Sequence, residues 1–200
     1  MEYQELKQLC IDLEHFETPL WTVDRILEKE ILTSDVIDPC TGTGIMAKAA
    51  SQRGYNVFPM DIHDWGYPGT SIIDFLSAQP DLCNNIGEFT IFMNPPFSKT
   101  CEFLEKAFEL GARKVVMFQR WAFKESAGRR EFLEKYPMAR MYLCGDRASS
   151  YRHDIPINEK GKRYNPETMK EMSGTSTAHG YFVWEKGQEQ SNPPTFMLYK

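Results

Sequence analysis

The stretch DVIDPCTGTGIMAKAASQRGYNVFPMDI, residues 35–62, decides the fold of this chain. It begins as a short apolar strand at 35–39 and turns through TGTG into a helix that ends at Gly54. A second strand follows at 56–62. A strand, a glycine turn, a helix and another strand form a βαβ unit, whose strands lie parallel in one sheet.

The segments on either side continue this alternation. Helical periodicity covers 2–15, 19–30, 101–111 and 128–136, and strand patterns cover 88–94, 114–119, 139–144 and 179–186, with a short element at 71–78. The alternation predicts an α/β fold with a mainly parallel sheet. The connection 145–178 is too long for an idle loop. We expect residues 1–200 to form one domain that carries 145–178 as a basic insertion.

Composition excludes several classes of protein. The apolar content is 42% and the charged content 26%, which is typical of a globular domain. There is no apolar run of about 18 residues, so we expect no membrane span, and the polar, acidic start is unlike a signal peptide. The five cysteines form no CxxC pair and the four histidines lie apart. We therefore expect reduced thiols, no metal site and a cytoplasmic location.

The net charge of −5 is distributed unevenly. Residues 1–110 hold 7 basic against 18 acidic side chains, whereas 111–170 hold 14 against 7. A basic segment on an acidic body indicates a polyanionic partner, although solvated helix faces would give the same pattern. The candidate contacts are Arg120, Arg129, Arg130, Arg147, Arg152, Lys160, Lys162 and Arg163. The weak overall charge argues against tight unaided binding to duplex DNA.

The glycine turn predicts a ligand site. Gly42 and Gly44 would let the backbone approach a ligand closely, beside the N-terminus of the following helix. The chain lacks the GxxxxGK[ST] phosphate loop, and the carboxylate of Asp38 suits a cationic ligand better than a diphosphate. This pattern favours a sulfonium cofactor over a nucleotide.

Two further acids follow strands. Asp61 has the spacing of an acid that accepts hydrogen bonds from ribose hydroxyls. Asp74 could accept from an adenine amino group, with Phe75 packed beside the ring. The alternatives are a simple turn at Asp61 and a helix cap at Asp74.

The strand at 88–94 ends in Asn94-Pro95-Pro96-Phe97. Proline cannot donate to a sheet ladder, so the strand must stop, and the rigid backbone would hold Asn94 and Phe97 at the edge of the sheet. Two prolines can also be a plain strand terminator.

Taken in order, these motifs resemble the S-adenosylmethionine-dependent amino methyltransferases of the DNA adenine-N6 type. That family has an Asp-Pro-x-x-Gly-x-Gly loop and a catalytic [Asn/Asp/Ser]-Pro-Pro-[Tyr/Phe/Trp] signature. ETPLWTVDRIL, 17–27, resembles its leading Thr-Pro motif, and YFVWEKG, 181–187, resembles the final strand of many phage and prophage members. The second Asn-Pro-Pro, 192–194, is predicted to be a tail turn. The resemblance covers about residues 16–120 and 139–187.

The resemblance implies a Rossmann-like class I methyltransferase fold, with a mainly parallel seven-stranded sheet and helices on both faces. It implies methyl transfer from S-adenosylmethionine to the N6 amino group of adenine in DNA. The implied cofactor residues are Thr18, Pro19, Asp38, Pro39, Cys40, Gly42, Gly44, Asp61, Ile62, Asp74, Phe75 and Asn94. The implied catalytic residues are Asn94, Pro95, Pro96 and Phe97. The candidates for substrate contact are Phe97, Arg120, Arg147, Arg152, Lys162 and Arg163.

An exocyclic amino group is a poor nucleophile because its lone pair is delocalised into the ring. The Asn94 side-chain oxygen and the Pro95 carbonyl could accept its hydrogens and localise that lone pair, which is catalysis by orientation and electrostatics. Phe97 would stack on the extruded base.

The sequence departs from the family in two respects. Phe97 stands where many DNA enzymes have Tyr, and the Phe form also occurs in RNA methyltransferases and in modification subunits that need a recognition partner. Only the 34 residues 145–178 are available to recognise a target. Three alternative functions therefore stay open: an RNA adenine methyltransferase, a protein glutamine methyltransferase and a non-catalytic cofactor-binding subunit. A dehydrogenase is disfavoured, because the third glycine of the dinucleotide-binding fingerprint is absent.

Overall fold

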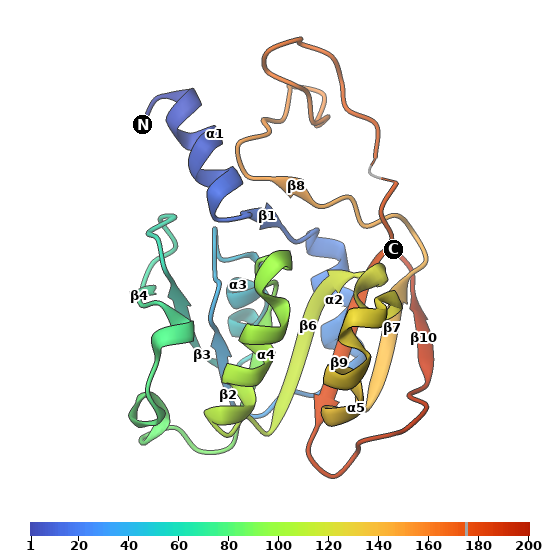
Figure 1. The fold of residues 1–200 in the computed structure, drawn as a ribbon. Helices are drawn as coiled ribbons and strands as arrows, with labels where there is room; N and C mark the ends of the chain where they lie inside the picture. Colours follow the sequence, from blue (N-terminus) through green and yellow to red (C-terminus); the bar gives the residue numbers. More distant parts are fainter. Residues whose placement is uncertain (175) are drawn as a thin grey trace.

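The computed structural model describes residues 1–174 and 176–200, so residue 175 of the predicted insertion lies outside the described residues. Its centre is an eight-stranded sheet with the order β10-β7-β9-β6-β5-β2-β3-β4 (Figure 1). The strands are β2 (Asp35–Asp38), β3 (Asn56–Asp61), β4 (Ser71–Ile72), β5 (Phe89–Met93), β6 (Lys114–Arg120), β7 (Arg140–Cys144), β9 (His179–Glu185) and β10 (Thr195–Leu198). Only β9 runs antiparallel to its neighbours β6 and β7; the other pairs are parallel.

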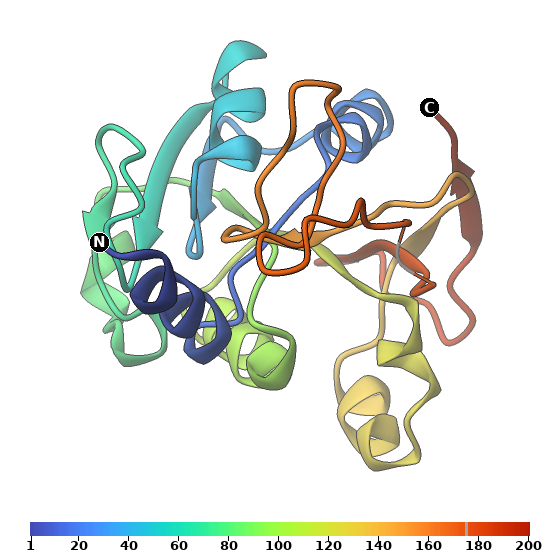
Figure 2. The ribbon, with the colours of Figure 1, turned by 90° about the horizontal axis from the view of Figure 1, so that it is seen from above.

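Helices cover both faces of the sheet, as Figure 2 shows from above. The helices are α1 (Tyr3–Asp12), α2 (Leu20–Lys29), α3 (Ile45–Gln52), α4 (Thr100–Glu109) and α5 (Arg130–Lys135). Side chains alternate across each strand, so Phe92 of β5 joins the core cluster under α2 and α3, whereas Ile91 and Met93 join the cluster under α4. The predicted βαβ unit, the parallel sheet and its two helical layers are confirmed.

The sheet has one strand more than the seven expected. Strand β10 pairs in parallel with β7 and buries Leu198 to 2% exposure. Its Phe196 ring lies 5.4 Å from that of Tyr142. The segment 181–187 is therefore not the end of the sheet, and the bend at the second Asn-Pro-Pro leads directly into this edge strand.

A small second sheet lies across the carboxyl ends of the parallel strands (Figure 1). It consists of β1 (Phe16–Glu17) and β8 (Tyr151–Arg152), which pair antiparallel. Because β8 belongs to the segment 145–178, residues 150–163 of this segment are folded against the N-terminal part of the chain. The two segments form a cover over the sheet edge at which ligands bind in α/β folds.

The basic segment 111–170 does not form one face. Lys114 and Arg140 begin β6 and β7, at the opposite edge of the sheet, where both form ion pairs with the buried carboxylate of Glu30 and with Glu185. Their charge is neutralised inside the protein, so only part of the positive balance can serve a partner. No helix in 1–174 or 176–200 is long and apolar enough to cross a membrane.

Candidate functional site

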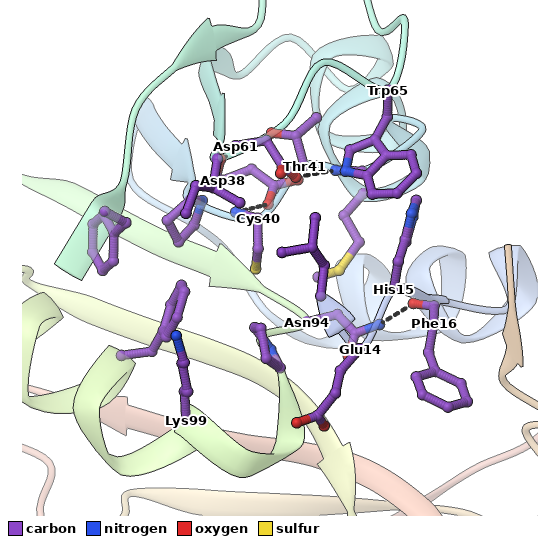
Figure 3. Close-up of a pocket in the computed structure, with 18 of the residues that line it drawn as sticks. Glu14, His15, Phe16, Asp38, Cys40, Thr41, Asp61, Trp65, Asn94 and Lys99 are labelled. Carbon is purple, nitrogen blue, oxygen red and sulfur yellow. Dashed lines mark hydrogen bonds between the residues drawn. The ribbon is translucent and has the colours of Figure 1, made fainter. Parts of the chain in front are cut away.

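A cleft opens at the carboxyl ends of β2, β3 and β5, under the cover formed by the N-terminal segment (Figure 3). It encloses about 990 Å³, including space open to solvent. Of the predicted site residues, it is lined by Thr18, Asp38, Pro39, Cys40, Gly42, Asp61, Ile62, Asp74, Phe75, Asn94 and Pro96. The structure therefore brings most of the predicted cofactor residues and Asn94 together around one cavity.

The glycine loop is held in a left-handed conformation. Gly42 has φ +56° and Gly44 has φ +85°, a region that side chains with a Cβ rarely adopt. A Cβ at Gly42 would lie 2.7 Å from Nε2 of His15, and one at Gly44 would enter the ring of Tyr67. Gly42 thus faces the cleft, whereas Gly44 is the N-cap of α3 and packs under Tyr67 outside the cleft lining.

Two buried carboxyl groups lie beside this loop. Asp38 is 1% exposed, and burial raises its pKa to about 8 against the opposing effect of the Cys40 backbone N–H. Burial also raises the pKa of Asp61, although that carboxylate accepts hydrogen bonds from Gly42 N (2.8 Å) and from the Trp65 indole. Both groups would gain from a cation placed near them.

Asp74 and Phe75 lie at the far end of the cleft. The Asp74 carboxylate caps a short 3-10 helix, because it accepts from Leu76 N at 3.0 Å and from the Ser77 hydroxyl at 2.9 Å. Phe75 is buried and stacks on Phe103 at 5.5 Å. Asp74 is therefore a helix cap, as the alternative interpretation of the sequence predicted, and its side chain also lines the cavity.

The side-chain amide of Asn94 is oriented by the N-terminal segment. Its Nδ2 donates to the Phe16 carbonyl at 2.8 Å and to the Thr18 hydroxyl at 3.0 Å (Figure 3 shows the first bond). Since a backbone carbonyl can only accept, the NH₂ group must be the one that faces Phe16. Oδ1 is left without a donor among the described residues, so it is available as an acceptor.

Phe97 lies beside the cleft and outside its lining. Its ring centroid is 5.6 Å from that of Phe16, and the Arg120 guanidinium lies 4.4 Å over it. Pro95 is buried, and its carbonyl accepts no hydrogen bond from the described residues. Pro19 caps α2 and does not line the cavity.

The predicted substrate-contact residues differ in whether their charges already have partners inside the protein. Arg152 pairs with the buried Asp154, and Arg163 pairs with Glu17 at 2.6 Å. Arg120 and Lys162 have exposed side chains, and Arg147 makes interactions within the protein. Arg152 and Arg163 therefore have partners inside the protein, which lowers their value as phosphate contacts.

Sequence patterns missed several lining residues: Glu14, His15, Phe16, Trp65 and Lys99. Glu14 has φ +49° and accepts from Ser98 N, so it connects the cover to the segment after Phe97. His15 lies 4.0 Å from the Trp65 ring, and burial lowers its pKa to about 4. The signal available was their position: Glu14, His15 and Phe16 come just before the Thr-Pro motif, Trp65 comes just after the second strand, and Lys99 follows Asn-Pro-Pro-Phe.

The charges of the lining restrict what the cleft can hold. Six carboxyl groups line the cleft: Asp12, Glu14, Glu17, Asp38, Asp61 and Asp74. Among the described lining residues, Lys99 is the one lysine or arginine. Two of the six contribute little free charge, because burial keeps Asp38 largely protonated at neutral pH and Arg163 neutralises Glu17. The other four still outnumber Lys99, so a diphosphate would be repelled and a ligand with a positive charge would be attracted. The chemistry of the cleft fits a sulfonium cofactor and does not fit a dinucleotide.

No family model and no curated protein matches the sequence. Several solved structures are similar in fold. A proposed RNA methyltransferase from Pyrococcus horikoshii matches over 92% of this chain and 98% of its own, with a TM-score of 0.52 and 16% identity. The modification subunit of a proposed type I restriction enzyme from Vibrio vulnificus matches over 97% of this chain, with a TM-score of 0.56 and 14% identity.

The match spans 50% of the length of that modification subunit. A proposed hemolysin from Lactococcus lactis matches over 88% of this chain and 91% of its own, with a TM-score of 0.57 and 11% identity. At such identities the likeness shows the fold alone, since one fold serves many functions. The predicted Rossmann-like class I methyltransferase fold is confirmed.

Proposed function

We propose that this protein transfers a methyl group from S-adenosylmethionine to the N6 amino group of adenine in nucleic acid, with DNA as the first substrate to test. The observation that carries the proposal is the orientation of Asn94, whose two amide hydrogens are used by Phe16 and Thr18. Its Oδ1 is thereby presented as a hydrogen-bond acceptor at the edge of an acidic cleft. A target amino group needs such an acceptor.

The cofactor would be held by the cleft residues already described. Asp38 and Asp61 would supply negative charge, Gly42 would allow close approach of the backbone, and Asp74 with Phe75 would contact the adenine end. When bound, S-adenosylmethionine would supply an electrophilic methyl group. The acidic lining and the left-handed glycine loop support this assignment.

The catalytic task of the chain is to orient the target amino group. Asn94 Oδ1 and the Pro95 carbonyl would accept its two hydrogens, which turns the nitrogen lone pair out of conjugation with the ring. As the new N–C bond forms and the methyl–sulfur bond breaks, the amino nitrogen becomes cationic. The hydrogen that one of these acceptors orients would then pass to solvent, because a neutral amide oxygen is too weak a base to keep it. Phe97 would stack on the base once Arg120 moves from the ring face, because base and guanidinium would compete for the same aromatic surface.

The test is transfer of labelled methyl from S-adenosylmethionine to duplex DNA, single-stranded DNA, RNA and a protein with exposed glutamines, assayed in parallel. We expect N6-methyladenosine or its deoxy form after digestion to nucleosides. Label in glutamine would move the proposal to a protein substrate, and cofactor binding without transfer would indicate a subunit that needs a recognition partner.

Cofactor affinity should depend on pH through Asp38. The free protein holds this carboxyl with a pKa of about 8 because it is buried, and a bound cation would favour its ionised form. Binding at pH 6 to 8 should therefore release a proton, and affinity should rise by up to about tenfold per pH unit and level off above pH 8. Calorimetry in two buffers of different ionisation enthalpy measures the proton release.

Asp38→Asn is the control for this prediction, since it removes the titrating group and leaves the shape of the side chain. The variant should bind the cofactor more weakly and show only the pH dependence of the ligand's own amino group. If the cofactor affinity of the unmodified protein and of Asp38→Asn depended on pH to the same extent, Asp38 would not be part of the cofactor site.

Exposed lysines of the segment 145–178 should contribute to nucleic-acid binding. Lys160 and Lys162 are exposed and form no ion pair among the described residues. Reversing both charges to Glu should weaken binding and reduce the slope of log K against log salt by about 2. Cofactor affinity should stay unchanged.

The matched control reverses Lys29 and Lys186, two exposed lysines at the opposite edge of the sheet. This double variant has the same net charge as the first. If both double variants weaken nucleic-acid binding equally, the effect is one of net charge and the segment has no special contact with the substrate.

A further inference from the structure

The N-terminal segment 16–18 lies directly against the side chain of Asn94. Both amide hydrogens of Asn94 are donated to it, one to the Phe16 carbonyl and one to the Thr18 hydroxyl. Thr18 is only 4% exposed, and its own hydroxyl hydrogen is directed to Met46 Sδ at 3.5 Å. The lone pairs of the hydroxyl oxygen are thus left for Asn94, so Thr18 defines one rotation of the amide.

The same segment is bound on its other side by 145–178. Phe16 and Glu17 pair with Arg152 and Tyr151 in the small sheet. The buried Ser150 hydroxyl donates to the Glu17 carbonyl at 2.7 Å. The backbone of 16–17 is therefore held by residues 150–152 through both main-chain and side-chain hydrogen bonds.

The Glu17 carboxylate provides a third attachment. Arg163 donates to one oxygen at 2.6 Å, and His153 Nδ1 lies 2.9 Å from the other. Burial acts to raise the pKa of Glu17, and these two partners outweigh it and hold the pKa below its ordinary value. Arg163 also donates to the Ile155 carbonyl, so the cation is part of the inserted segment's own structure.

We infer that the inserted segment 145–178 acts as a template for the catalytic amide: it holds β1 in place, and β1 in turn orients Asn94. Thr18 and Glu17 are positioning residues in this arrangement. Thr18 acts on Asn94 directly, and Glu17 acts through the backbone of Phe16. The inference rests on the proposed function, and it gives the segment a structural task in the site besides contact with the substrate.

Thr18→Val is the first test, because valine keeps the shape of threonine and removes the acceptor. The variant should show about a tenfold lower kcat, with the KM for the nucleic acid nearly unchanged. Thr18→Ser restores the hydroxyl and should restore most of kcat. An unchanged kcat in Thr18→Val, or a serine variant as impaired as the valine one, would overturn the role of Thr18.

Glu17→Gln and Arg163→Met test the clamp, separately and together. Both single variants should lower kcat, and the double variant should be no worse than the stronger single one, because both break one pair. Lys7→Met is the matched control, since the Lys7–Glu167 ion pair also joins α1 to 145–178 but lies away from Asn94. If Arg163→Met weakens nucleic-acid binding and leaves kcat unchanged, Arg163 is a phosphate contact and the clamp is refuted.

A spectroscopic measurement separates this inference from the proposed function. In protein labelled with ¹⁵N at asparagine, the Asn94 side-chain NH₂ signal is assigned by its loss in Asn94→Ala. Its protons should exchange slowly with water in the unmodified protein and faster in Thr18→Val and Glu17→Gln, with no substrate present. Fast exchange in the unmodified protein would refute the template even if methyl transfer is found, and slow exchange without any transfer would refute only the proposed function.

Discussion

An Asn94→Ala protein is expected to lose at least about 100-fold in the rate of methyl transfer while it still binds S-adenosylmethionine. The substitution removes the side-chain oxygen that, under the proposed function, accepts a hydrogen from the target amino group. Loss of a single pre-positioned polar group of this kind typically costs on the order of 100- to 1,000-fold in rate. Single-turnover transfer of labelled methyl, with cofactor affinity measured by calorimetry, tests both halves of the expectation.

The substitution also removes the two bonds from Asn94 to Phe16 and Thr18. Some loss of stability is therefore expected, about 1 kcal/mol per hydrogen bond, and the melting temperature has to be measured beside the rate. Thr18→Val loses one of the same two bonds and keeps Oδ1, so it provides the matched comparison. If Asn94→Ala were no slower than Thr18→Val, the amide oxygen would have no catalytic role and the Asn-Pro-Pro-Phe segment would be only a strand terminator.

Local sequence patterns predict much of the fold and part of the candidate site. The glycine turn after Asp38 and the acid at the end of the next strand identify the cofactor edge, because strands of a parallel βαβ unit end at the same side. The prolines after Asn94 identify the end of β5 in the same way. These features are determined by residues that are neighbours in the sequence, so they could be predicted from the sequence alone.

Features that depend on distant partners could not be predicted. Strand β1 is two residues long and is formed by pairing with a segment that begins about 130 residues later along the chain, so it has no periodicity of its own. Arg163 resembles a solvent-exposed cation in the sequence, but Glu17 neutralises it. The orientation of the Asn94 amide depends on β1 and on the Arg163–Glu17 pair that holds it. The sequence could therefore identify Asn94 as a site residue, but it could not show in which direction the amide points.

A Gly42→Val protein is expected to lose at least about 100-fold in affinity for S-adenosylmethionine. Gly42 has φ +56°, and a β-branched residue is a severe outlier in that region. Its Cβ would lie 2.7 Å from Nε2 of His15, so either His15 or the loop, both of which line the cleft, must shift. The Gly42 N–H also donates a hydrogen bond to the Asp61 carboxylate, so displacement of the loop would disturb this second carboxylate as well.

Gly54→Val is the control that makes this prediction decisive. Gly54 has φ +88° at the end of α3, and a Cβ there meets nothing within 4 Å. Both variants carry backbone strain of about 1–2 kcal/mol, so both should melt at a lower temperature. Only Gly42→Val should lose cofactor affinity by calorimetry. If both variants bind the cofactor equally well, the ligand does not approach the glycine loop, and the acidic cleft must hold it in another way.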